Sequence, residues 1–377
     1  MPSETALNRR IGSIDMMRGL VMLLMLVDHV RERFYLHMQV TDPMTLDSTS
    51  PGLFLSRFAA HFCAPTFVFL TGLSAWLYSQ KPGRSARSFL AKRGLFLIAL
   101  ELTLVTFSWM GSYQTLYLQV IWAIGLSMLA LAALASLPRP WLLALGLVIV
   151  FGHNLLSPIS LQPGDWGYSL WTVLHDRGYL ISQGPLAVKV SYPVLPWIGV
   201  ILLGYGAGPL YGRTLPAARR HQWLLALGLG CLVLFALLRG LNLYGESLPW
   251  QQGSNLGWTL MSLFNLTKYP PSLAFLLVTL GGMFLGLLAF ERPLGRLGSW
   301  LSDFGAAPMF FYLLHLYVLL GLYSLAIALL GPNHGTLLGV DSIAWVWLIS
   351  AALALYFPTR AFSAFKQRQP WPLLKYL

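Results

Sequence analysis

Ten stretches of the chain are dominated by apolar residues, and each is long enough to cross the roughly 30 Å hydrocarbon core of a bilayer as a helix. They cover residues 17–36, 57–79, 93–110, 114–136, 141–157, 194–211, 222–241, 271–290, 305–330 and 342–359. The pattern predicts an all-α fold, a polytopic membrane helix bundle of about ten transmembrane helices around a central polar tunnel. We expect one integral-membrane domain over residues 1–377.

The composition agrees with this class. Hydrophobic residues make up 56% of the chain and charged residues only 10%, with a mean hydropathy of +0.64. Soluble domains carry roughly 25% charged residues, so the sequence describes a membrane protein whose first partner is the lipid bilayer. We expect no nucleic-acid partner in spite of the formal net charge of +12, and the sequence leaves a homodimer open.

The basic residues favour one side of the predicted membrane. With the N-terminus inside, 17 of the 25 Lys and Arg residues fall in cytoplasmic segments and seven in external ones, and Arg18 lies at the inner end of the first stretch. The positive-inside rule then places both termini in the cytoplasm and the protein in the cytoplasmic membrane as a multi-pass protein. It makes residues 1–13 and 361–377 cytoplasmic segments and residues 152–192 the longest external loop.

The first apolar stretch carries a cation and a titratable ring on one face. Ser13 is the expected N-cap, so that the helix begins near Ile14. Arg18 and His29 are eleven residues apart, which is within about 20° of three helical turns and about 16 Å along the axis. Such groups are costly at membrane depth and indicate a functional site. A plain ion pair of Arg18 with Asp15, three residues earlier, is the structural alternative.

Four further polar residues lie in or next to predicted spans. Glu101 and His315 fall in the middle of the third and ninth stretches, and His61 and Lys268 lie near the outer ends of the second and eighth. We expect them to contact the substrate if they converge on the tunnel. Each also has a structural interpretation, either as a bond between neighbouring helices or as a side chain that reaches the interface.

The residue types favour acyl transfer from a phosphorylated carrier. The imidazole of His29 can remove a proton from a hydroxyl or amine that attacks a carbonyl, and Asp28, about 100° away on the helix, can orient a substrate amine. Arg18 offers a fork of donors for phosphate. A carrier held at Arg18 by its phosphates, with a flexible arm that reaches His29, has the shape of coenzyme A.

Other common sites are missing from the sequence. It contains no Walker A loop, HExxH, GxSxG or paired CxxC motif, and we expect no metal. Cys63 and Cys231 fall inside predicted spans and are interpreted as small apolar residues. Two pairs of glycines spaced four apart predict close helix packing: Gly204 with Gly208, and Gly282 with Gly286.

Several ordered motifs resemble heparan-α-glucosaminide N-acetyltransferase-like proteins, which are related to acyltransferase family 3 and its Arg-x10-His signature. Arg18 and His29 match that signature. The remaining matches are Ala64-Pro65-Thr-Phe-Val-Phe-Leu-Thr-Gly72, Gln119-Val-Ile-Trp122-Ala-Ile-Gly125, Pro196-Trp197-Ile-Gly199 through Gly204-Tyr-Gly206, Lys268-Tyr-Pro-Pro271-Ser, and Phe310-Phe-Tyr-Leu-Leu-His315.

The resemblance implies a membrane-embedded acyltransferase that takes acetyl from cytoplasmic acetyl-CoA and delivers it to a sugar amine or hydroxyl on the external side. By the same analogy His29 is catalytic, as base or acyl carrier, and Arg18 binds the coenzyme. Arg93 is a second candidate phosphate ligand, and Gln119 and Trp122 are candidate coenzyme contacts. The acceptor is a sugar or glycan that the resemblance does not identify.

Two alternatives concern the acceptor and the reaction. The external loop carries aromatic residues and a carboxylate suited to sugar binding, or to an interfacial aromatic belt: Trp166, Tyr168, Trp171, His175 and Asp176. A proton-coupled transporter is the alternative function, with a relay through Asp28, His29, Glu101 and His315.

Overall fold

A computed structural model describes residues 11–369, 371 and 374. The longer helices are α1 (Gly12–Phe34), α3 (Cys63–Ser79), α4 (Ala86–Leu100), α6 (Val120–Leu134), α7 (Arg139–Gly152), α9 (Leu195–Gly206), α10 (Ala217–Gly240), α12 (Leu273–Ala289) and α14 (Pro308–Leu330). The shorter ones are α2 (Pro51–His61), α5 (Thr106–Met110), α8 (Tyr168–Leu174), α11 (Leu256–Phe264), α13 (Gly295–Gly305), α15 (Ile343–Ala352) and α16 (Tyr356–Arg368). The fold is an all-α helical membrane bundle, as the apolar stretches predicted.

Each predicted stretch contains a helix, but several are interrupted. A π-helical turn, Glu101–Val105, joins α4 to α5, and α15 is bent by 40° from the start of α16. Within the described residues, four helical segments are long and apolar enough to span a membrane, and the bent pair makes a fifth. These segments are Pro51–Ser79, Arg139–Leu156, Ala217–Gly240 and Pro308–Leu330. The count of ten spans stays a prediction.

A small sheet was not predicted. Strands β1 (Thr115–Leu118), β2 (Gly178–Ile181) and β3 (Ala187–Val190) form the order β1-β3-β2, with β1 parallel and β2 antiparallel to β3. Strand β1 lies within the apolar stretch 114–136, and a short apolar strand cannot be told from helix by periodicity alone. The sheet ties the external loop to the start of α6.

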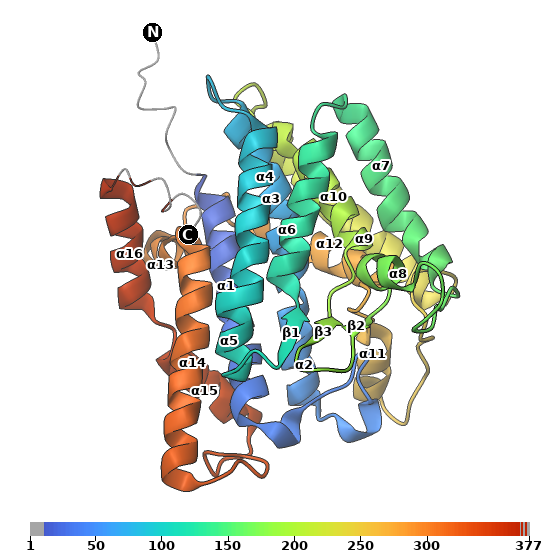
Figure 1. The fold of residues 1–377 in the computed structure, drawn as a ribbon. Coiled ribbons are helices and arrows are strands. Elements are labelled where there is room, and N and C mark those ends of the chain that lie inside the picture. The colour runs from blue at the N-terminus through green and yellow to red at the C-terminus, as the bar shows by residue number, and fades with distance from the viewer. Residues whose placement is uncertain (1–10, 370, 372–373, 375–377) are drawn as a thin grey trace.

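Helix α1 runs through the middle of the bundle (Figure 1), where it packs against α2, α3, α12, α13, α14 and α15. Glycines allow the closest of these contacts. A Cβ atom on Gly19 would lie 2.0 Å from the carbonyl oxygen of Leu301, and one on Gly305 would lie 1.8 Å from that of Asp15. Helices α1 and α13 therefore meet backbone to backbone, which fixes the position of Asp15 and Arg18.

The predicted N-cap of α1 is wrong. The helix begins at Gly12 after Ile11, with no capping side chain, and Ser13 lies inside the first turn. The Ser13 hydroxyl donates instead to Glu291 Oε1 at 2.7 Å. Burial raises the pKa of Glu291, but the hydrogen bonds from Ser13 and Arg220 and the charge of Arg220 outweigh it and hold that pKa below its ordinary value. The Ser13 hydroxyl is therefore engaged in a tertiary contact, which the local sequence does not reveal, and does not cap the helix.

The predicted glycine contacts are confirmed. A Cβ on Gly204 of α9 would lie 2.1 Å from the carbonyl oxygen of Phe69 on α3, and one on Gly208 would lie 2.4 Å from the Trp76 ring. Added Cβ atoms on Gly282 and Gly286 would crowd Phe62 and Met17. Cys63 and Cys231 are both free, in line with their interpretation as small apolar residues.

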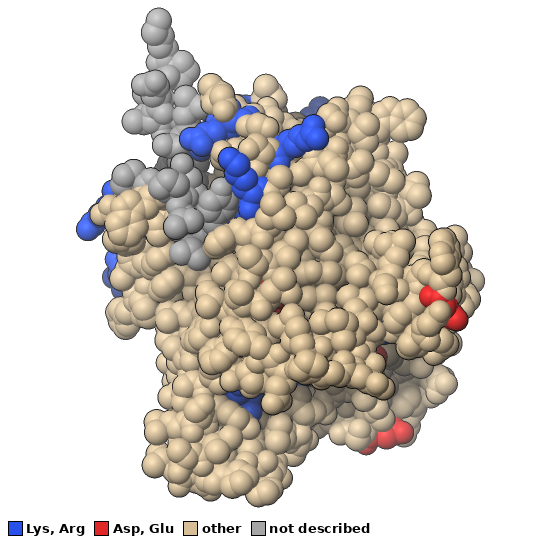
Figure 2. Space-filling model, in the orientation of Figure 1, with Lys and Arg blue, Asp and Glu red and all other residues tan. Residues whose placement is uncertain are grey.

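The two ends of the bundle differ in charge. Figure 2 shows Lys and Arg side chains gathered at the upper end of the view, near the connection between α3 and α4, and acidic side chains toward the lower right. We call the end with the α3–α4 connection the basic end; the start of α1 lies toward it (Figure 1). The other, far end holds the sheet and the connections from α1 to α2 and from α11 to α12. Of the segments predicted to be cytoplasmic, residues 1–10 and most positions after 369 lie outside the described residues.

Candidate active site

A cavity of about 980 Å³ extends along α1. Near the start of that helix it is lined by Asp15 and Arg18, and near the end of the helix by Asp28 and His29. Side chains of α3, α4, α6 and α14 complete its walls. The central polar tunnel that the sequence predicted therefore has a counterpart in the structure, and Arg18 and His29 both face it.

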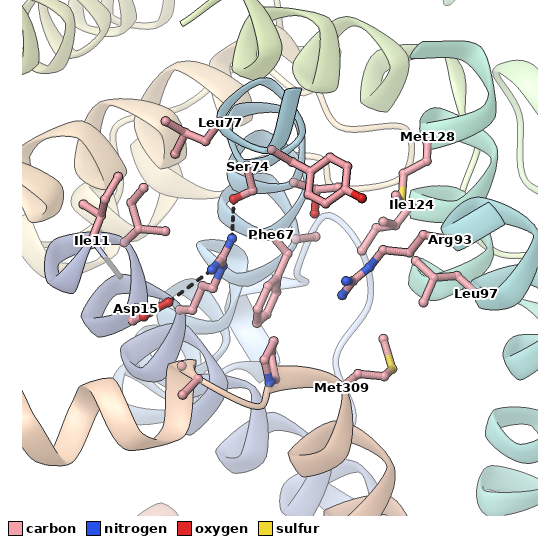
Figure 3. Close-up of a pocket in the computed structure, with 18 of the residues that line it drawn as sticks. Ile11, Asp15, Phe67, Ser74, Leu77, Arg93, Leu97, Ile124, Met128 and Met309 are labelled. Atoms are coloured by element: carbon pink, nitrogen blue, oxygen red, sulfur yellow. Dashed lines mark hydrogen bonds and ion pairs between the residues drawn. The ribbon is translucent and has the colours of Figure 1, made fainter. Parts of the chain in front are cut away.

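At the basic end, two arginines line opposite walls. The Arg18 guanidinium donates to Asp15 Oδ1 at 3.2 Å and to the Ser74 hydroxyl at 2.5 Å, as the dashed lines of Figure 3 show. Arg93 reaches toward the same space from α4. The predicted Asp15–Arg18 pair is thus present, and it does not remove Arg18 from the cavity. Lys81, Arg213 and Lys366 also line this cavity.

Farther along the cavity, His29 is hydrogen-bonded to a second histidine. Its Nδ1 lies 2.7 Å from Nε2 of His315, whose own Nδ1 lies 2.8 Å from the carbonyl oxygen of Phe311. The two imidazole rings are stacked, with centroids 5.0 Å apart. The ring of Trp109 meets the edge of His29 at 5.0 Å, so the imidazole is held on several sides.

The hydrogen bonds assign the protons of both rings. A carbonyl oxygen only accepts, so Nδ1 of His315 donates to Phe311. With both rings neutral, Nε2 of His315 is left as an acceptor, and Nδ1 of His29 donates to it. The lone pair of His29 then lies on Nε2, on a ring that lines the cavity. Neutral rings are expected because burial of an uncompensated cation is costly.

Asp28 also lines the cavity, but its carboxylate is engaged by arginines. Oδ1 accepts from Arg31 at 2.8 Å, and Oδ2 accepts a short hydrogen bond from Arg57. Glu32 approaches the same two guanidinium groups, at 3.1 Å from Arg31 and 3.6 Å from Arg57. Asp28 is therefore the centre of a buried ion cluster. Its contact with a substrate amine stays a prediction.

Lys268 enters the cavity from the segment before α12. Only 5% of this residue is exposed, and its ammonium lies over the rings of Tyr192 and Tyr269, 5.9 Å and 5.1 Å from their centroids. Tyr192 is a cavity residue that the sequence interpretation missed. Its position depends on the unpredicted sheet, because it follows β3 by two residues.

Five predicted site residues are not among those that line the cavity in the described part of the chain: His61, Glu101, Gln119, Trp122 and His315. Glu101 is fully buried, and its Oε2 accepts from the backbone N–H of Trp122 at 2.9 Å. Gln119 lies at the N-cap position of α6 without a capping side-chain bond, and His61 packs against Phe58 of its own helix and Phe275 of α12. Their roles toward coenzyme and substrate stay predictions.

The external loop folds on itself. His175 is buried, stacks on Trp171 with centroids 4.8 Å apart, and has its Nε2 3.1 Å from the carbonyl oxygen of His153. Trp166 is 98% exposed. The predicted acceptor residues of this loop are absent from the described cavity wall. Both interpretations of the loop, sugar binding and an interfacial aromatic belt, stay predictions.

A comparison with known families identifies the family of the chain. A family model described as heparan-alpha-glucosaminide N-acetyltransferase, catalytic, matches residues 10–237, which is more than half of the chain and includes Arg18, His29 and Arg93. No curated protein matches the chain. Lys268 and His315 lie beyond the matched residues, so their part in the site is seen from the structure. The chain therefore belongs to the heparan-alpha-glucosaminide N-acetyltransferase family, a family of membrane acetyltransferases.

Proposed function

We propose that the protein transfers an acetyl group from cytoplasmic acetyl-CoA to an amine or hydroxyl of a sugar acceptor that enters from the external side. The observation that carries the proposal is the continuous cavity, which Arg18 and Arg93 line at the basic end and His29 and Lys268 line farther in. The family supplies the acetyl-CoA donor and the acetyltransferase activity. The excess of basic residues at the coenzyme end supports a cytoplasmic donor.

The donor fits the basic end by charge and by length. Guanidinium groups bind phosphate through two donors at once, and Arg18 and Arg93 present such groups from opposite walls. The rise from Arg18 to His29 along α1 is about 16 Å, so an extended pantetheine arm held by its phosphates would place the thioester beside the imidazole.

The chemistry at His29 follows from its assigned lone pair. The acceptor amine attacks the thioester carbonyl carbon, and Nε2 of His29 takes the proton that the nitrogen loses. The tetrahedral intermediate collapses, the C–S bond breaks, and the CoA sulfur receives that proton as it leaves. The products are the acetylated acceptor and CoA with a free thiol. A route through an acetyl-histidine uses the same nitrogen, first as nucleophile.

The proposal is tested by mass spectrometry and a transfer assay on the detergent-purified protein. We expect bound CoA or acetyl-CoA to co-purify, and we expect radiolabelled acetyl to move from acetyl-CoA to a sugar amine such as glucosamine. Absence of transfer to every sugar amine and hydroxyl offered, with acetyl-CoA left unchanged, would contradict the proposed function.

Arg18→Ala is expected to weaken the binding of the acetyl-CoA donor. Loss of a charge-assisted contact costs about 1.5–3 kcal/mol, so the KM for acetyl-CoA should rise about ten- to hundredfold, with a smaller change in kcat. Arg87→Ala is the matched control, because Arg87 is exposed on the same basic end and does not line the described cavity. Steady-state kinetics in acetyl-CoA decide the point, and an unchanged KM would remove Arg18 from the coenzyme site.

His315 is proposed as a positioning residue, because it acts on the reaction only through His29. In His315→Leu the acceptor for His29 Nδ1–H is lost, so we expect kcat to fall about a hundredfold while the KM for acetyl-CoA stays constant. His315→Gln keeps an oxygen that can accept this hydrogen bond and should recover part of the rate. Equal loss in both variants would indicate a packing role for His315.

The transporter alternative finds less support. In the described residues, the relay of Asp28, His29, Glu101 and His315 is joined by a hydrogen bond only between the two histidines. Glu101 bonds to Trp122 and Asp28 to two arginines. A proton path through these four groups would need connections that the geometry does not supply.

A further inference from the structure

Lys268 is a buried cation whose ammonium has no direct carboxylate or carbonyl partner among the described residues. It is 5% exposed and lines the cavity that also holds His29. Among the described residues, no carboxylate oxygen lies within 4.0 Å of its ammonium and no hydrogen bond to it is found; two tyrosine rings are its contacts. A tyrosine face contributes about 0.5–2 kcal/mol, which falls short of the cost of burying a charge.

Neighbouring buried cations differ from Lys268 in this respect. Arg31 and Arg57 share the carboxylate of Asp28, and Glu32 lies within 4.0 Å of both. Two arginines and two acids thus balance at this site. The ammonium of Lys268 takes no part in these direct pairs, and the nearby carboxylate of Asp42 binds the backbone N–H of Lys268 instead.

The other buried arginines also have direct hydrogen-bond partners. Arg33 donates to two backbone carbonyl groups, at 2.7 Å and 3.1 Å. Arg239 donates to four, at 2.5–3.2 Å. Lys268 alone of the five buried Lys and Arg residues that the structure describes lacks both a carboxylate and a carbonyl partner.

The ammonium is held on a rigid segment. The carboxylate of Asp42 accepts from the backbone N–H of Lys268 at 3.1 Å and from that of Tyr269 at 3.0 Å. The hydroxyls of Tyr192 and Tyr269 are hydrogen-bonded at 3.1 Å, so the two rings under the ammonium are tied to each other. Asn265 adds bonds to both the N–H and the carbonyl of Met44. The backbone of Lys268 is therefore fixed before any ligand binds.

We propose that Lys268 forms an anion subsite, and that the acceptor is a sugar bearing a carboxylate or a phosphate group. The anionic group binds the ammonium, the sugar lies along Tyr192, and its amine or hydroxyl meets Nε2 of His29 in the same cavity. Such a subsite completes the coordination of the buried cation at the moment of binding. This inference rests on the proposed function and names the class of its acceptor.

The test compares three sugars that share an amine and differ at carbon 6. They are glucosamine, glucosamine 6-phosphate and 2-amino-2-deoxyglucuronic acid, each titrated calorimetrically into the purified protein. We expect at least one anionic sugar to bind about tenfold or more tightly than glucosamine, which corresponds to about 1.4 kcal/mol. The stronger of the two anionic probes identifies the phosphate or the carboxylate as the preferred group.

Variants assign the difference to Lys268. Lys268→Met keeps the length of the side chain and should abolish the preference for the anionic sugars, whereas Lys268→Arg should keep it. Lys189→Met is the matched control, because the Lys189 ammonium also lies over a tyrosine ring, 5.0 Å from the centroid of Tyr179, but does not line the described cavity. Phosphate binding at the basic end is the same in all these proteins and cancels in the comparison.

Stability separates a binding role from a structural one. Replacement of an unpaired buried cation by an apolar residue of similar size is neutral or stabilising, so the melting temperature of ligand-free Lys268→Met should stay or rise. A fall would show that the ammonium supports the fold through the tyrosines and would contradict the subsite.

Two further outcomes overturn the proposal. One is equal binding of all three sugars by the parent protein, and the other is an anion preference that survives in Lys268→Met. Failure of the subsite is distinct from failure of the proposed function, because a protein that acetylates glucosamine from acetyl-CoA without any preference for anionic sugars would retain the function and lose only the subsite.

Discussion

His29→Ala is expected to abolish acetyl transfer while the protein keeps its fold and its affinity for acetyl-CoA. Nε2 of His29 is the atom that the hydrogen bonds leave with a lone pair, on a ring that lines the cavity. General base catalysis contributes about 10²–10⁴-fold, and a route through acetyl-histidine would lose its nucleophile as well. The measurements are single-turnover transfer with radiolabelled acetyl-CoA and calorimetric binding of CoA.

The matched control is His37→Ala. His37 is exposed near the far end of the bundle, where its Nδ1 lies 3.2 Å from the carbonyl oxygen of Gly335, and its loss should leave transfer unchanged. If His29→Ala transferred acetyl at the rate of the parent protein, the proposed mechanism would be wrong. A liposome assay tests the transporter alternative. Movement of labelled sugar across the membrane without consumption of acetyl-CoA would favour transport over acetyl transfer.

Much of the fold could be predicted from the sequence because the signals are local. Apolar runs identify helices wherever they lie, and the spacing of Arg18 and His29 places both on one face of α1 without any tertiary information. The cavity along that face confirms the inference. The interruptions within the apolar runs were missed, because strand β1 and the turn at Glu101 depend on neighbouring segments.

The rest of the site could not be predicted, since it depends on contacts between distant segments. His29 and His315 are 286 residues apart, and each appeared as a separate polar residue in its own span. Ser13 failed as a cap for the same reason, because its partner is Glu291. Arg57 gave a detectable signal as a cation one turn before His61, but only the fold shows that it binds Asp28.

Asp28→Asn is expected to cost stability more than catalysis. The substitution keeps the shape of the side chain and removes the charge that Arg31 and Arg57 share. Glu32 is then the remaining carboxylate within 4.0 Å of the two guanidinium groups in the described structure. Removal of one partner from a buried ion pair destabilises by about 3–5 kcal/mol, so the melting temperature in detergent should fall clearly.

A second substitution tests the cause of that fall. Arg57→Met removes one of the two cations that share the single remaining carboxylate in Asp28→Asn, so the double variant should be more stable than the sum of the single effects predicts. Asp341→Asn, at an exposed position of the far end, is the control and should change stability by about 0.5 kcal/mol or less. Strict additivity in the double variant would contradict the ion-cluster account.

Kinetics at a temperature where Asp28→Asn stays folded then separate the two roles of Asp28. If the carboxylate serves only the cluster, kcat should fall less than about tenfold, because His29 keeps its bond to His315. A loss as large as that of His29→Ala, with the melting temperature unchanged, would instead make Asp28 a catalytic residue. The ion pairs favour the first result, since both carboxylate oxygens already accept from arginine.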